Sequence, residues 1–436
     1  MQEKQNSSYE GPVSLTALYK GHFIDTPTPG QFRVRKDAVA IVEDGKLLSL
    51  ERDVPARFLS LPVKDLGAGV VIPSFIDLHV HAPQHMQMGV GLALGLLDWL
   101  ENHTFPRESR FADEAYARAL YPLFAAELLR QGSLRSVVYG TVHLESTLIL
   151  AQALEKAGLI AFVGKVNMDR NAPDDLKESS EASFKGSEEF CRRLAGQGRV
   201  RPIVTPRFAP SCTKKLMKEL GRLSQRLNLP VQSHLAETLT EVQWVSQLFP
   251  ESRSYTDVYN DCGLLGPASL MAHAIFLNDE EINLIMEREA TLVHCPSANI
   301  NLGSGIMPMG RYLDTGVNLG LGSDVGAGHT LAMYRSVVQA VQASTLLRIL
   351  RPQENHRAVT LSEAFYLATM GNGKFFTRQG WVPCGAFEPG MSFDALAIDM
   401  GLPEAVDLSP LNQLERFLYA GDDRHIKIRI LAGRQL

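Results

Sequence analysis

Two patterns of apolar and polar residues divide the chain into two β-rich ends and a longer middle. From about Leu18 to Val71 apolar and polar residues alternate, as in strands with one buried face. The runs AVAIV and KLLSL are separated by Asp44-Gly45, a dipeptide favoured in two-residue hairpin turns. Near the C-terminus FDALAIDM and IKIRILAG alternate in the same way after the turn Pro389-Gly390. We therefore predict that the two ends pair into one small β domain.

Between these ends, eight apolar runs alternate with segments that have a helical pattern. The runs are VIPSFIDLHVH, SVVYGTVH, IAFVGKV, RPIVTPRF, PVQSHLAE, SLMAHAIF, TLVHCPSAN and NLGLGSDV. Eight strands alternating with helices predict an α/β fold, a (β/α)8 TIM-like barrel. We expect residues 71–384 to form this barrel, and residues 1–70 and 385–436 to form a small β-sandwich domain. The runs are irregularly spaced and show no repeat, which argues against a solenoid or a propeller.

Length, composition and charge are those of a globular enzyme that acts on a small molecule. The chain has 436 residues, 45% hydrophobic and 21% charged, which suits a large catalytic domain with a well-buried core. A net charge of -5 argues against nucleic acid or an anionic membrane as the main partner, because both select a basic surface. The five cysteines are scattered without a Cys-x-x-Cys pair, which favours reduced, buried thiols over a zinc ribbon or a redox motif.

The sequence shows neither of the usual signals for export or membrane insertion. The first residues, MQEKQNSSYEGP, contain no basic segment followed by an apolar one and no twin-arginine run. An uninterrupted stretch of about 18 apolar residues, as a membrane-spanning helix needs, is not found. We therefore expect a soluble, cytoplasmic protein.

Five potential metal ligands fall at the ends of the predicted barrel strands. His79 and His81 end the first run, and side chains two residues apart on a strand point to the same side. His234 ends the fifth run, His273 the sixth and Asp324 the eighth. Catalytic groups of this fold lie at the C-terminal rim of the strands, and imidazole and carboxylate are ligands that zinc prefers. The sequence therefore predicts a catalytic zinc site at this rim, with one position open for water.

Glu237 is the candidate for proton transfer at this site. It follows His234 by three residues and lies just beyond the predicted strand end. Zinc lowers the pKa of a bound water from about 15.7 to roughly 7, and a nearby carboxylate that does not bind the metal can then carry protons. The alternative is a structural carboxylate in the first turn of a helix, where the helix dipole favours negative charge.

Beyond these residues, the sequence resembles the guanine deaminases of the amidohydrolase superfamily. The resemblance covers nearly the whole chain after the first dozen residues and rests on PSFIDLHVHAPQ, LLDWLENHTFP, VGKVNMD, PIVTPRF, SHLAE, MAHAIF, HCPSAN, LGLGSDVGAG and FLYAGDD. His-x-His, SHxxE and a late Ser-Asp mark the superfamily, whereas HAPQ, DWL, TFP and TPRF together resemble guanine deaminase. Ser323 and Ala327 stand where threonine or glycine is commoner, and neither difference removes a ligand.

The resemblance implies a homodimeric enzyme that hydrolyses guanine to xanthine and ammonia with one Zn²⁺ per chain. It implies that zinc is bound by His79, His81, His234, His273 and Asp324. It makes Glu237 and Asp324 the catalytic acid and base. It places the guanine contacts on Gln84, Trp99, Leu100, Arg207 and Phe208. An arginine fork and an amide match the O6 and N7 acceptors of guanine, and aromatic rings match a planar base.

Ordinary structural roles remain open for several of these residues. Trp99 in the apolar segment LLDWL is otherwise a core residue, and Arg207 is otherwise the partner of a carboxylate. His294 ends the seventh run, but the resemblance gives it no metal role, so we expect a structural or supporting one. Hydantoinase-like relatives bridge two metals with a lysine at the end of the fourth strand. Here that run ends in Arg207-Phe208, and Lys165 ends the third run instead, which favours a single zinc.

Two other functions are also compatible with the sequence. A sibling deaminase acting on thiomethyladenosine, S-adenosylhomocysteine or cytosine would share the metal ligands and differ in its pocket, so Gln84 and Arg207 discriminate between them. A barrel that has lost catalysis and serves as an interaction scaffold belongs to a different class. Such proteins usually lose metal ligands, whereas every expected ligand and Glu237 are present here.

Overall fold

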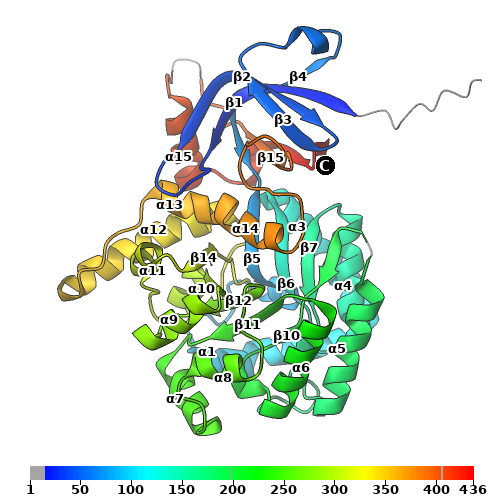
Figure 1. Cartoon of the computed structure of the whole chain (residues 1–436), viewed down its shortest axis with the longest axis vertical. Coiled ribbons are helices and arrows are strands. Elements are labelled where there is room, and N and C mark those ends of the chain that lie inside the picture. The colour runs from blue at the N-terminus through cyan, green and yellow to red at the C-terminus, as the bar shows by residue number, and fades with distance from the viewer. Residues whose placement is uncertain (1–14, 197, 404–405) are drawn as a thin grey trace, which may run out of the picture.

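The chain folds into a smaller β-sheet part at one end and a larger α/β body beneath it (Figure 1). The computed structural model describes residues 15–196, 198–403 and 406–436. The N-terminal segment that was searched for an export signal, and with it the start of the expected domain 1–70, lies outside the described residues.

The small end of the molecule is built from both ends of the chain, as the alternating pattern predicts. Its strands are β1 (Thr16–Asp25), β2 (Arg33–Glu43), β3 (Lys46–Glu51), β4 (Val63–Pro73), β15 (Ala395–Ile398), β16 (Ile426–Leu431) and β17 (Arg434–Gln435). They form one seven-stranded sheet in the order β17-β16-β15-β4-β1-β2-β3, in which β4 and β15 pair antiparallel. One apolar core receives side chains from β1, β2, β3, β4, β15 and β16, so the sheet curls around it. In Figure 1 the blue N-terminal and red C-terminal strands accordingly lie side by side.

The turn predicted at Asp44-Gly45 joins β2 to β3. Both residues have positive φ, 50° and 79°, the conformation of a type I′ turn whose twist matches that of the flanking strands. A Cβ on Gly45 would lie 2.5 Å from the carbonyl oxygen of Ala432. Glycine is therefore required here both by the backbone conformation and by the close approach of the C-terminal segment.

Each of the eight apolar runs in the middle of the chain contains a strand. One parallel four-stranded sheet consists of β5 (Phe75–His81), β6 (Ser133–Tyr139), β7 (Ile160–Gly164) and β9 (Val200–Pro202). A second consists of β11 (Val231–Leu235), β12 (Ser269–His273), β13 (Thr291–His294) and β14 (Asn318–Leu321). The short strands β8 (Val166–Asn167) and β10 (Thr205–Pro206) pair with each other between the two sheets.

Backbone contacts join the two parallel sheets on both sides. On one side Val204 forms a parallel bridge with Val231 of β11. On the other side the Asp324 N–H donates to the His79 carbonyl at 2.8 Å, and the His81 N–H donates to the Val325 carbonyl at 2.9 Å. The segment after β14 is therefore hydrogen-bonded to β5, and the C-terminal ends of both sheets share one rim.

Helices alternate with these strands along the chain and lie outside them, and one further helix, between β15 and β16, packs against the seven-stranded sheet (Figure 1). They are α1 (Leu96–Trp99), α2 (Phe105–Glu108), α3 (Glu114–Gln131), α4 (Leu144–Lys156), α5 (Ser180–Leu194), α6 (Lys214–Leu227), α7 (Leu239–Leu248), α8 (Tyr255–Asp261), α9 (Asp279–Glu287), α10 (Pro296–Asn301), α11 (Met309–Thr315), α12 (Met333–Leu350), α13 (Leu361–Tyr366), α14 (Asn372–Arg378) and α15 (Pro410–Ala420). Capping boxes at Thr238 and Asn278 start α7 and α9 directly after β11 and β12. These caps fix where the chain leaves the rim.

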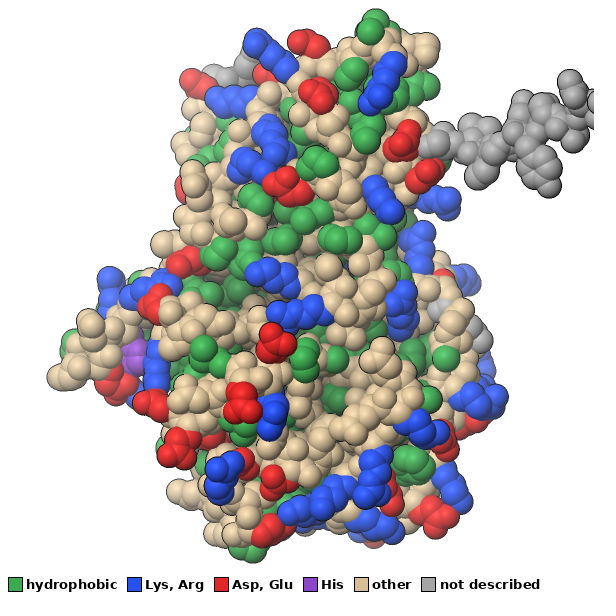
Figure 2. All heavy atoms as spheres, viewed as in Figure 1, with side chains coloured by type: hydrophobic (Ala, Val, Ile, Leu, Met, Phe, Trp, Pro, Cys, Tyr) green, Lys and Arg blue, Asp and Glu red, His purple; other side chains and the backbone are tan. Residues whose placement is uncertain are grey.

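The surface mixes charges, and the cysteines are buried. On the face drawn in Figure 2, basic and acidic side chains are interspersed. All five cysteines are free and buried, as their scattered positions predict. Within the described part of the chain, helices long and apolar enough to cross a membrane are not found.

Candidate active site

The predicted metal ligands converge at the rim of the parallel strands. One donor atom from each of His79, His234, His273 and Asp324 lies within 4.8 Å of the others. Nε2 of His81 is 3.3 Å from Nε2 of His79, 3.2 Å from Nε2 of His234 and 3.3 Å from Oδ1 of Asp324. The structure therefore brings together all five residues, which come from β5, β11, β12 and the segment after β14.

Hydrogen bonds at Nδ1 of His234 and His273 orient Nε2 of each ring toward the centre of the cluster. Nδ1 of His234 lies 2.6 Å from the Arg207 carbonyl oxygen, and Nδ1 of His273 lies 2.8 Å from Oδ1 of Asn299. A ring that donates through Nδ1 keeps Nε2 unprotonated, which is the arrangement typical of metal-binding histidines. Nε2 of His273 is buried and has no hydrogen-bond partner among the described residues. Such an orphaned nitrogen fits a site built around a cation.

Burial favours the neutral form of His81 and His234. It lowers the pKa of His81 to about 4 and the pKa of His234 well below its ordinary value, because the charged form loses its hydration. Neutral imidazole is the form that binds a metal. The donor set of histidines and one carboxylate therefore fits a divalent metal ion.

Backbone strain concentrates where the strands end at the cluster. His273 and Asp324 have positive φ of 71° and 48°, and the nearby Ala236 and Ala274 both have φ of 48°. Residues other than glycine rarely adopt this conformation, and it persists where the surrounding structure enforces it. Two of these four strained residues are predicted metal ligands.

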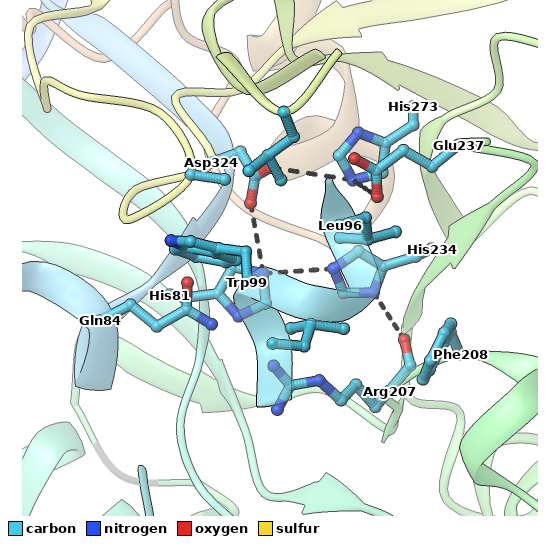
Figure 3. Close-up of a pocket in the computed structure, with 13 residues that line it drawn as sticks. His81, Gln84, Leu96, Trp99, Arg207, Phe208, His234, Glu237, His273 and Asp324 are labelled. Atoms are coloured by element: carbon cyan, nitrogen blue, oxygen red, sulfur yellow. Dashed lines mark hydrogen bonds and ion pairs between the residues drawn. The ribbon is translucent and has the colours of Figure 1, made fainter. Parts of the chain in front are cut away.

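Glu237 lies beside the cluster and faces the pocket (Figure 3). Its Oε2 is 3.5 Å from Nε2 of His273, and its Oε1 accepts a hydrogen bond from Oγ of Ser304 at 2.8 Å. Burial, reinforced by the charge of Asp324, raises the pKa of Glu237 to about 8. Helix α7 begins only at Leu239, so Glu237 precedes the first helical turn rather than belonging to it.

A cavity opens beside the cluster. It is lined by His81, Gln84, Leu96, Trp99, Leu100, Arg207, Phe208, His234, Glu237, His273, Leu302, Asp324 and Ala327. The five residues predicted to contact guanine are all in this lining, and Figure 3 shows Gln84, Trp99, Arg207 and Phe208 around one space with the histidines. Leu96, Leu302 and Ala327 were not anticipated, because an isolated apolar residue carries no sequence signal for a pocket.

Arg207 pairs with a buried carboxylate that the sequence analysis missed. Its Nη2 donates to Oε1 of Glu108 at 3.2 Å, and its Nη1 pairs with Oε2 of the same carboxylate. Nε2 of Gln84 donates to Oε1 of Glu108 at 2.8 Å. The alternative in which Arg207 binds a carboxylate is thus observed, yet Arg207 also lines the cavity. Glu108 follows the motif LLDWLENHTFP by two residues, and this position was the only feature of the sequence that placed it near the pocket.

Lys165 and His294 lie outside the cavity lining. Lys165 is buried and its Nζ donates to Oε2 of Glu178 at 2.6 Å, so it is paired with a carboxylate. His294 is buried at the end of β13, and neither ring nitrogen has a hydrogen-bond partner within the described part of the chain. Burial lowers the pKa of His294 to about 3, so this ring is also neutral.

The fold and the site together define a class of protein. It is an α/β protein in which buried histidines and an aspartate that could bind a metal ion border a pocket. Residues 70–436 match the family described as the amidohydrolase family. The chain therefore belongs to the amidohydrolase family, and within it the chain groups with proteins named guanine deaminase.

Three relatives illustrate this grouping. Guanine deaminase of Dictyostelium discoideum is 37% identical over 97% of this chain and 98% of that protein. Guanine deaminase of Homo sapiens is 35% identical over 97% of each chain. The crystal structure of guanine deaminase from C. acetobutylicum with bound guanine in the active site superimposes with a TM-score of 0.93, at 40% identity, covering 97% of this chain and 100% of that one.

Proposed function

We propose that this protein hydrolyses guanine to xanthine and ammonia with one zinc ion per chain. One observation carries the proposal: a single cavity is bordered by the histidine and aspartate cluster and by two donors, Gln84 and Arg207. Such donors suit the O6 and N7 acceptors of guanine. The similarity to guanine deaminases over nearly the whole chain supports the same substrate.

The five converging residues would hold the zinc: His79, His81, His234, His273 and Asp324. When bound, zinc supplies a water that is activated at neutral pH. A single ion is proposed because the lysine that bridges two metals in hydantoinase-like relatives has no counterpart here. The fourth run ends in Arg207-Phe208, and the buried Lys165 of the third run is already paired with Glu178.

Glu237 and Asp324 would carry the protons of the reaction. Loss of the amino group at C2 requires a proton at ring N3 while water adds, and another on the departing nitrogen. Glu237, whose raised pKa favours a held proton, would donate to N3. Asp324 would accept a proton from the water and pass it to the amino group, which leaves as ammonia. The remaining hydroxyl proton would return to Glu237 as the C2 carbonyl of xanthine forms.

Guanine would lie among Gln84, Trp99, Leu100, Arg207 and Phe208. Nε1 of Trp99 donates to the Val90 carbonyl at 3.0 Å, which holds the indole as a wall of the pocket. Aromatic walls favour a flat base, and the donors fix its orientation with C2 toward the cluster.

The alternatives have less support. The donor pair of Gln84 and Arg207 suits a 6-oxo purine, whereas the adenine ring of thiomethyladenosine or S-adenosylhomocysteine presents a 6-amino donor at that position. An inactive scaffold does not require five converging ligands, an orphaned Nε2 on His273 or strained backbone at the rim.

The finer architecture is also a proposal. We assign residues 71–384 to a closed (β/α)8 barrel and residues 1–70 and 385–436 to a small β-sandwich. The backbone contacts between the segment after β14 and β5 support closure. The core shared by strands across the curled seven-stranded sheet supports a sandwich-like small domain.

A cytoplasmic location, expected from the sequence, and a homodimer, which the resemblance implies, complete the proposal. Leu346, Ile349 and Leu350 on α12 are 42%, 64% and 64% exposed and offer an apolar surface for self-association. Light scattering of the purified protein tests this part directly, since a monomer at micromolar concentration would refute it.

The function is tested by following the ultraviolet spectrum of guanine with purified protein, with and without a chelator. Adenine, cytosine and thiomethyladenosine serve as parallel substrates. We expect guanine to disappear with matching xanthine and ammonia, and chelation to abolish this activity. Turnover of another base without turnover of guanine would keep the metal chemistry and refute the pocket assignment.

A further inference from the structure

The two hydrogen-bond donors that line the pocket, Gln84 and Arg207, both bind the same buried carboxylate, that of Glu108. Glu108 ends α2 and is only 2% exposed. Its Oε1 accepts from both Gln84 and Arg207, and its Oε2 pairs with Nη1 of Arg207. An ionised carboxylate can only accept hydrogen bonds, so each group that faces Glu108 must present an N–H to it.

Glu108 fixes the orientation of the Gln84 amide. Oε1 of Gln84 accepts from the Gly326 N–H at 3.1 Å, while Nε2 gives one hydrogen to Glu108. The amide oxygen is thus committed to the backbone, and the second Nε2 hydrogen remains for the cavity that Gln84 lines. If the amide were turned by about 180°, it would offer an acceptor to the cavity. Its oxygen would then face the carboxylate of Glu108, which is unfavourable because both groups are hydrogen-bond acceptors.

The same carboxylate fixes the plane of the Arg207 guanidinium. Two of its nitrogens face Glu108, and its Cζ lies 5.3 Å from the centre of the Phe105 ring. A fork held in this way directs its remaining N–H groups in defined directions. Glu108 therefore controls the direction of both donors although it is absent from the cavity lining.

We propose that Glu108 is the positioning residue that sets base specificity, by holding Gln84 and Arg207 as hydrogen-bond donors toward the O6 and N7 edge of a purine. This inference rests on the proposed function, since it explains how the same pocket selects its substrate. A 6-oxo purine meets both donors with acceptors, whereas a 6-amino purine keeps the N7 acceptor but places an N–H donor where O6 would lie. Leaving buried polar groups unpaired in this way is strongly unfavourable.

The test measures binding of hypoxanthine and adenine to the zinc-loaded protein by calorimetry, comparing wild type with Glu108→Gln. Hypoxanthine has the O6 and N7 acceptors but no 2-amino group, so it is not consumed, and adenine carries the 6-amino donor. We expect wild type to prefer hypoxanthine by about 100-fold or more. Glu108→Gln should lower this preference at least about tenfold, because a neutral amide no longer forces both neighbours to donate.

Asp394→Asn is the matched control. Asp394 is also buried and accepts from Nε of an arginine, Arg135, at 2.7 Å, but this pair lies outside the cavity. The control should lower thermal stability and leave the preference unchanged. An unchanged preference in Glu108→Gln, or an equal loss in both variants, would overturn the proposal.

Glu108→Asp is the second variant if Glu108→Gln does not fold. It keeps the charge on a shorter side chain that reaches both partners less well, so its preference should fall between those of the other two proteins. A wild-type preference in Glu108→Asp would overturn the proposal. Because hypoxanthine binding needs no turnover, a protein that fails to deaminate guanine refutes the proposed function without deciding this inference.

Discussion

Glu237 is the residue at which proton transfer can be separated from metal binding. Glu237→Gln removes the acid while keeping the shape of the side chain. We expect kcat for guanine to fall by about 10² to 10⁴, the usual contribution of a general acid. Zinc content should stay at the wild-type value, because Glu237 is not among the proposed ligands. Steady-state kinetics with metal analysis checks both, and near-normal turnover would contradict the scheme.

Ser304 supports Glu237 through the 2.8 Å hydrogen bond from its Oγ to Oε1. Ser304→Ala should lower kcat by about tenfold, because Glu237 loses the group that orients it, with a smaller change in KM. In the Glu237→Gln background the same change should have little further effect, since the two residues act as one unit. A full tenfold loss in that double variant would show that Ser304 acts independently of Glu237.

The clustering of the candidate ligands was predictable because they lie at strand ends, whereas contacts between residues far apart in the chain were not. The histidines and Asp324 close predicted strands, so the fold alone brings them together. Glu108 and Arg207 are 99 positions apart, and Ser304 and Glu237 are 67 positions apart. A single sequence contains no information about such pairs, because each partner taken alone is an ordinary polar residue.

Among the elements, the β2–β3 hairpin offers a sharp test of packing against the C-terminal segment. Gly45→Ala places a methyl group 2.5 Å from the Ala432 carbonyl oxygen at a residue with φ of 79°. We expect a loss of about 2 kcal/mol or more in the free energy of unfolding, of which roughly 1 kcal/mol reflects the backbone conformation. Denaturant titration measures this loss.

Gly30→Ala is the control for this hairpin variant. Gly30 has φ of 90°, and a Cβ there meets no atom of the described chain within 4 Å. It should therefore show only the backbone cost of about 1 kcal/mol. Equal losses in the two variants would mean that the approach of Ala432 to the turn contributes nothing.

Element boundaries followed the apolar runs except where proline or short segments intervened. The run RPIVTPRF contains two short strands, β9 and β10, rather than one, and each includes a proline, which lacks the N–H needed to continue a ladder. The segment LLDWLENHTFP folds as α1, a π-helical turn and the start of α2. Periodicity cannot separate pieces this short.

For the whole molecule, pairing between the two chain ends was predictable and the strand order was not. Alternating residues identify which face of a strand is buried, but not which strand lies beside it. The alternation therefore indicated a shared β domain, while the single sheet order with β15 next to β4 emerges only from the structure. The order of the parallel strands was easier to predict. Where strands and helices alternate regularly, strands that are consecutive in the chain are usually neighbours in the sheet.

A bound metal would tie together parts of the body that are far apart in the chain, since its proposed ligands come from β5, β11, β12 and the segment after β14. An ion that binds only the folded state stabilises it by about 2.7 kcal/mol at 100 times its Kd. Chelation should therefore lower Tm, and one equivalent of Zn²⁺ per chain should restore it. Two tightly held ions per chain would contradict the single-zinc site.

Two histidine variants decide whether this stabilisation belongs to the proposed ligands. His273→Ala should lose most of the zinc-dependent rise in Tm, because it removes the buried Nε2 that has no hydrogen-bond partner among the described residues. His294→Ala removes an equally buried imidazole at the end of the next strand, one that is not among the proposed ligands. It should lower Tm with and without metal while keeping the zinc-dependent difference. Thermal melts at fixed free Zn²⁺ compare the two, and the reverse pattern would place the ion on the other side of β13.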